Sequence, residues 1–215
     1  MNLRNVFFTL CFFPLVSVAQ EKNDVGFSVG ASYYMGDYNL ATQFYMPSPA
    51  IGVMFRHNFN EFYAIRVSGS HGQLKGSYSE SKHLLHNLPA ETSFSHQIAE
   101  IATSLEIGFR PFGTKPIDAH KFSPFVSVGV GAAYIDRKLV VHFPFGIGLK
   151  YTPFNRWTFG AQWQLHKTFT DNIDGYSNVT SIERLRIHNY DWIGIGGLFV
   201  SYRLVNKGAV CPVYD

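Results

Sequence analysis

The residues of this chain that could do chemistry are histidines, serines and a few acidic side chains. Nine histidines are present, and zinc is usually bound by histidines at short spacing. His83 and His86 have such a spacing, but they lie in a polar segment with no cysteine nearby. Asp171, Asn172 and Asp174 lack the ordered oxygens and the distal glutamate of a calcium loop. We therefore expect no metal site and no cofactor.

A hydrolase would need a serine and a histidine within hydrogen-bond reach of each other, with a third group to orient the histidine. His166, Ser177, His188 and Asp191 lie near the ends of two predicted strands. No nucleophile motif surrounds the serine, and in a chain with many serines and histidines such sets arise by chance. We expect no catalytic residues and no enzymatic activity, with a lipid hydrolase as the alternative.

The cysteines bear on where the protein is located. Residues 1–19 are typical of a secretory signal peptide, with Arg4, a short apolar core and the small-residue cleavage site Ser17-Val18-Ala19. Cleavage before Gln20 removes Cys11 and leaves Cys211. A single cysteine in an exported chain is either an inert thiol or the partner in an intermolecular disulfide, and both interpretations stay open.

The elements that position these residues follow from a two-residue alternation. Bulky apolar side chains alternate with small or polar ones in segments 25–33, 101–109 and 126–134, and successive side chains of a strand point to opposite faces. The alternation changes phase near Gly196-Gly197, which predicts a bulge there. The pattern predicts strands over residues 24–35, 50–57, 62–74, 97–110, 123–134, 145–151, 156–166 and 192–204.

Composition narrows the class of protein. Charged residues make up 15% of the chain and aromatic residues 16%, whereas soluble domains carry about 25% charged residues. No segment approaches the roughly 20 apolar residues of a membrane-spanning helix. The net charge of +3 is small and scattered, which excludes a nucleic-acid-binding surface. A β-barrel in contact with outer-membrane lipid is favoured.

The connections support the same conclusion. Segments 58–61 and 152–155 are short turns, whereas 36–49, 76–96, 135–144 and 167–191 are long. Such alternation is typical of outer-membrane barrels, which have long loops outside and short periplasmic turns. We predict an all-β fold: an eight-stranded antiparallel up-and-down transmembrane β-barrel over residues 20–204. Both termini are then periplasmic, with a tail over residues 205–215.

In this barrel the apolar face contacts lipid, and glycine, serine, alanine and glutamine face the lumen. Arg56, Arg66, Glu100 and Glu106 are expected to pair as a charged cluster inside, because an isolated buried charge is costly. Aromatic residues gather at strand ends, as in the interfacial girdles of membrane barrels. These are Tyr33, Phe62, Phe109, Phe125, Tyr134, Tyr151, Trp157 and Trp192.

Several segments together, in their order, resemble the PorG-like outer-membrane proteins of Bacteroidota. They are residues 25–38, 49–56, 167–174, 191–192 and the tail segment 211–214. The resemblance covers most of the mature chain, although the histidine-rich segment 76–96 does not match.

The resemblance implies a function in the type IX secretion system of Gram-negative Bacteroidota. A PorG-like barrel is a non-enzymatic anchor in the outer membrane for the periplasmic ring of the lipoprotein PorK and PorN, and it supports protein export and gliding motility. The ending Cys211-Pro212-Val213-Tyr214 is then the partner-binding segment, with an intermolecular disulfide from Cys211 to PorK. The alternative is a surface adhesin or envelope-stress barrel that acts through its extracellular loops.

Overall fold

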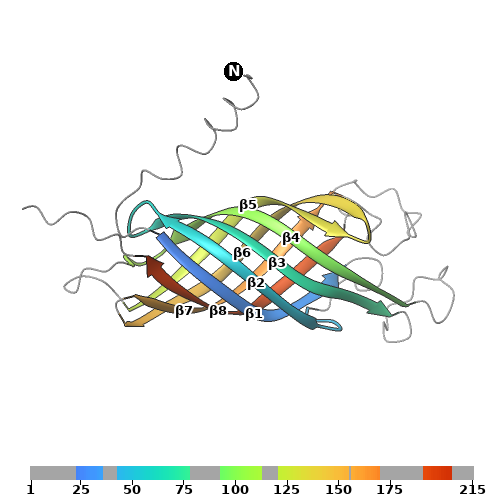
Figure 1. The fold of residues 1–215 in the computed structure, drawn as a ribbon, viewed down its shortest axis with the longest axis horizontal. Coiled ribbons are helices and arrows are strands. Elements are labelled where there is room, and N and C mark those ends of the chain that lie inside the picture. Colours follow the sequence, from blue (N-terminus) through green and yellow to red (C-terminus); the bar gives the residue numbers. More distant parts are fainter. Residues whose placement is uncertain are drawn as a thin grey trace, which may run out of the picture.

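Eight antiparallel strands follow one another around a closed barrel, because each strand pairs with the next and the last pairs with the first (Figure 1). The structure, a computed structural model, describes residues 23–35, 43–77, 93–112, 121–154, 156–169 and 191–204. The strands are β1 (Asn23–Met35), β2 (Ser48–Asn58), β3 (Tyr63–Ser77), β4 (Ser93–Gly108), β5 (Phe122–Ile135), β6 (Lys138–Phe154), β7 (Trp157–Thr168) and β8 (Trp192–Leu204). The predicted eight-stranded up-and-down antiparallel barrel is confirmed.

The alternation in the sequence becomes an alternation between the outer surface and the lumen. On β2, Ile51 and Val53 are 53% and 62% exposed, whereas Met54 and Arg56 are buried. Apolar side chains therefore cover the outside, and charged side chains such as Arg56 lie inside, which is the reverse of a soluble barrel. The strands contain 11 to 17 residues, and a tilted strand crosses a bilayer with about 9–11.

The two ends of the barrel differ in their connections. One end, here the termini end, holds the start of β1, the end of β8 and the connections 59–62, 109–121 and 155–156 (Figure 1). The opposite end, here the loop end, carries the connections 36–47, 78–92, 136–137 and 169–191. Among the residues that the structure describes, no helix is long and apolar enough to cross a membrane.

The expectation of a long connection over residues 135–144 is wrong. β5 and β6 meet in the two-residue turn Asp136-Arg137, whose φ angles of 43° and 65° fit the type I′ turn of tight hairpins. Proline is rare inside sheets because it has no N–H to donate. Pro144 in fact lies within β6, and the β5–β6 pairing is interrupted beside it, between Val128 and Gly131.

The expected bulge at Gly196-Gly197 is also wrong. β8 keeps a continuous register with both β1 and β7 through these glycines. The apolar phase changes because Ile193 and Ile195 point into the lumen, whereas Leu198 faces outward and is 63% exposed. A register shift lies elsewhere, between Tyr151 and Phe154 in the β6–β7 pair.

The lumen is more apolar than the sequence pattern indicates. Near the loop end it is filled by a cluster that we call the apolar plug: Tyr34, Leu74, Ile98, Ala133, Ile135 and Ile193. Nearer the termini end, Met54, Phe125 and Phe199 form a second buried cluster. Phe125 therefore does not belong to the predicted girdle. Tyr33 lies on the outer wall at the end of β1, where Phe44 packs beside it and the side chain is buried.

Candidate functional site in the charged lumen

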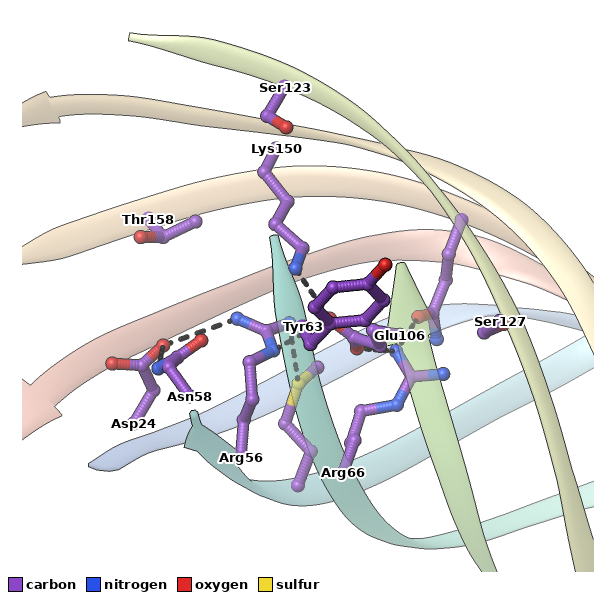
Figure 2. A network of polar contacts seen from close by, with 12 residues as sticks. Asp24, Arg56, Asn58, Tyr63, Arg66, Glu106, Ser123, Ser127, Lys150 and Thr158 are labelled. Carbon is purple, nitrogen blue, oxygen red and sulfur yellow. Dashed lines mark hydrogen bonds and ion pairs between the residues drawn. The ribbon is translucent and has the colours of Figure 1, made fainter. Parts of the chain in front are cut away.

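Glu106 on β4 is the centre of an ion-pair network inside the barrel (Figure 2). Its carboxylate lies 3.0 Å from Arg56 Nε, 3.0 Å from Arg66 Nη1 and 2.5 Å from Lys150 Nζ. All four residues are buried. They come from β2, β3, β4 and β6, so one carboxylate connects strands that are not all neighbours around the barrel.

Asp24 on β1 forms the second half of this network. Its carboxylate lies 3.4 Å from Arg56 Nη1, and it accepts hydrogen bonds from Arg203 Nε at 3.0 Å and from Asn58 Nδ2 at 3.1 Å. Arg56 therefore bridges the two carboxylates. Through Asp24 and Arg203 the network extends to β1 and β8, where the barrel closes.

The network holds more cations than carboxylates, since four cationic side chains face Asp24 and Glu106. Neutral groups also contact them. Arg56 Cζ lies 5.4 Å from the centre of the Phe199 ring, and Lys150 Nζ lies 4.6 Å from that of Phe125. Aromatic faces attract cations in this geometry, which explains why two phenylalanines point into a charged lumen.

A separate polar group lies nearer the loop end, where Glu100 of β4 meets two histidines. Glu100 Oε2 is 2.9 Å from His166 Nδ1 and 3.6 Å from His142 Nε2. The two imidazole rings stack, with centroids 4.8 Å apart and an interplanar angle of 12°. Ser70 donates a hydrogen bond to the other carboxylate oxygen, Oε1, at 2.9 Å.

The structure thus divides the predicted charged cluster into two. It brings Arg56, Arg66 and Glu106 together, but it places Glu100 with the histidines instead. Asp24 was not predicted, although it lies two residues from Gly26 on the small-residue face of β1. His142 was missed because its strand segment was interpreted as a loop. Alternation over residues 138–143 was the available signal.

Of the four candidate hydrolase residues, two lie in the part of the chain that the structure describes. His166 faces the lumen and contacts Glu100, whereas Asp191 Oδ1 accepts a hydrogen bond of 2.6 Å from Tyr34. The remaining candidates lie outside the described residues: the signal peptide, His83, His86, Asp171, Asn172, Asp174, Ser177, His188 and the tail residues Cys211, Pro212 and Tyr214.

The lumen arrangement cross-links strands. Its side chains face the axis of the barrel and are buried there. Along the axis they run from the ion pairs of Glu106 past Glu100 to the apolar plug. A small barrel of about eight strands has room only for side chains. The site can therefore hold the wall rigid, and surfaces at the two ends remain for contacts with other molecules.

Solved structures share this fold. Neisserial surface protein A (NspA) superposes with a TM-score of 0.50 at 10% sequence identity, over 85% of this chain and 97% of that chain. Ail, the attachment invasion locus protein of Yersinia pestis, gives a TM-score of 0.48 at 10% identity, over 86% and 99% of the two chains. The N-terminal barrel domain of Pseudomonas aeruginosa OprF gives 0.45 at 14% identity, over 87% and 100%. At these identities the similarity concerns the fold alone.

Sequence comparison gives a family rather than an activity. No curated protein matches the chain. Residues 3–213 match the family described as "Domain of unknown function (DUF6089)". Since this match covers nearly the whole sequence and includes every strand of the barrel, the chain belongs to the DUF6089 family.

Proposed function

We propose that this protein is a non-enzymatic outer-membrane barrel that anchors the periplasmic PorK/PorN ring of the type IX secretion system. The observation that carries the proposal is the inside-out wall around a filled lumen. Apolar residues such as Ile147 and Val53 cover the outside, while the ion pairs of Glu106 lie within. Such a barrel is held by lipid, and its partners bind at its ends.

The assignment to type IX secretion is supported by the resemblance of the sequence to PorG-like proteins. The resemblance includes the segments around the first strand and the tail with Cys211, Pro212 and Tyr214. The tail follows β8 directly at the termini end, which also carries the two-residue connection 155–156. In the proposed orientation this end faces the periplasm, where the ring lies.

A tail of residues 205–215 is a small contact surface. Stable protein interfaces bury about 800 Å² on each partner, and eleven or so residues provide less than most complexes use. A disulfide from Cys211 to PorK would add a covalent link in an oxidising compartment. We therefore propose Cys211 as the attachment point, with Pro212 and Tyr214 beside it.

The test is affinity purification of the tagged full-length protein from detergent-solubilised membranes of its native host. We expect PorK and PorN to co-purify. On non-reducing gels the wild type and Lys207→Ser should give a slower band that contains PorK, and Cys211→Ser should lack it. Identical migration of all three proteins would reject the disulfide. Absence of PorK and PorN from the purified material would reject the anchoring function.

The alternative is a surface adhesin or envelope-stress barrel. It is favoured by the loop end, where three of four connections are long: residues 36–47, 78–92 and 169–191. Replacing residues 78–92 by a two-residue Asn-Gly turn separates the two functions. An anchor keeps its periplasmic partners after this change, whereas an adhesin loses surface binding and is insensitive to Cys211→Ser.

A further inference from the structure

Three side chains in the lumen have the donor set of a metal site. Glu100 of β4, His142 of β6 and His166 of β7 each offer one ligand atom, and these atoms all lie within 4.8 Å of one another. Both histidines are at most 1% exposed. We propose that Glu100, His142 and His166 bind a divalent transition-metal ion of the zinc type inside the barrel.

The distances agree with this proposal. Zinc binds histidine nitrogen and carboxylate oxygen at about 2.0–2.2 Å, which places neighbouring ligands of a tetrahedral ion about 3.4 Å apart. Glu100 Oε2 lies 3.6 Å from His142 Nε2 and 2.9 Å from His166 Nδ1. The ligand atoms of the two histidines lie within 4.8 Å of each other. The ion replaces the proton that lies between His166 and Glu100.

The nitrogens left without partners are a second, independent observation. His142 Nδ1, His142 Nε2 and His166 Nε2 are buried without a hydrogen-bond partner. Buried polar atoms are rarely left unpaired, because each loses its hydration without compensation. An ion bound through His142 Nε2 and His166 Nδ1 satisfies one of these three nitrogens, His142 Nε2.

The surroundings also suit a bound ion. Ser70 holds the second oxygen of Glu100 at 2.9 Å, and hydrogen bonds of this kind orient the ligands of metal sites. Gly131 lies opposite His142 on β5, and a Cβ atom at Gly131 would lie only 2.6 Å from the imidazole ring. Because Gly131 has no side chain, the imidazole ring of His142 can occupy this space.

The donor chemistry selects the class of ion. Imidazole suits zinc and its neighbours, whereas magnesium and calcium prefer oxygen ligands. Three protein ligands leave a fourth position for water. The ligands come from β4, β6 and β7, so a bound ion links a wall of four consecutive strands. The apolar plug lies on one side and the Glu106 network on the other, so the ion enters while the barrel folds.

The experiment measures metal in the full mature protein, prepared without a histidine tag. The protein is refolded into detergent micelles with Zn²⁺ or Co²⁺, dialysed against a weak chelator, and analysed by mass spectrometry for metal content. We expect about one retained ion per barrel, and a visible absorption spectrum for the cobalt form. Ser70→Ala should weaken zinc affinity about 10- to 100-fold in competition with a chromogenic chelator.

Variants give the controls. His142→Gln and His166→Gln, alone and together, should reduce retained metal to background, whereas His71→Gln should not, because His71 lies exposed on the outer face of β3. Gel migration of unheated samples verifies that each variant is folded. Metal retention by the double variant equal to that of the wild type would overturn the proposal, as would a folded wild type that retains no ion. If the double variant does not fold, the affinity of Ser70→Ala decides: an affinity unchanged from the wild type overturns the proposal.

Discussion

At the residue scale, Glu106 is the carboxylate on which the ion-pair network depends. Three cations approach its carboxylate within 3.0 Å, and all of them are buried. Removing one partner of a buried ion pair is more destabilising than never having had the pair, because the remaining charges keep their desolvation cost. The network therefore depends on this one carboxylate more than on any of its cations.

Glu106→Gln should lower the free energy of unfolding by about 3–5 kcal/mol. Glu61→Gln is the matched control in an exposed turn and should change it by less than about 0.5 kcal/mol. Chemical denaturation in lipid vesicles, followed by tryptophan fluorescence, measures both. Adding Lys150→Met to Glu106→Gln removes one unpaired cation and should restore part of the loss. A double variant that is no more stable than the single variant would contradict the network interpretation.

At the element scale, the turn of the β5–β6 hairpin has a backbone conformation that its residues do not favour. Type I′ turns prefer Asn-Gly because both central residues need positive φ. Asp136 and Arg137 adopt φ of 43° and 65° despite their side chains. The strands on both sides continue the barrel wall, and their pairing therefore imposes the turn.

Arg137→Gly should raise the free energy of unfolding by about 1 kcal/mol, because glycine adopts positive φ without the steric cost of a Cβ atom. Arg137→Ala removes the same charge but keeps the Cβ, and it should give no such gain. The comparison of the two variants in thermal unfolding isolates the backbone effect. Equal stabilisation by both would attribute the effect to charge instead.

At the scale of the whole molecule, apolar side chains lie on the outer surface of the wall and charged ones in the lumen. This distribution decides whether the protein is stable in water or in a membrane. Ile147 and Leu139 both face outward on β6, the first near the middle of the strand and the second beside the hairpin turn. If a bilayer surrounds the barrel, a charge at Ile147 lies in hydrocarbon, whereas a charge at Leu139 reaches the interface.

Ile147→Arg should therefore destabilise the barrel in lipid vesicles by about 2–4 kcal/mol, and Leu139→Arg by about 0–1 kcal/mol. Equilibrium folding into vesicles of short-chain phosphatidylcholine measures the difference. If both substitutions destabilised the barrel equally, the two positions would not lie at different depths in a bilayer. That result would contradict the proposed location in the outer membrane.

The sequence by itself determined that the chain forms eight strands and that the bulky apolar residues of its most regular segments point outward. These features depend on the two-residue period of a strand, which each segment such as 101–109 or 126–134 carries on its own. For the same reason Phe27 and Val53 could be placed on the outer surface without knowledge of their neighbours.

Only the tertiary structure decided which lumen residues meet. Glu106 finds Arg56, Arg66 and Lys150, and Glu100 finds His142 and His166, because contacts across the lumen depend on the register and stagger of all eight strands together. No single segment contains this information. A residue's face is a local property of the chain, whereas its depth in the barrel and its partner across the lumen exist only once the sheet has closed.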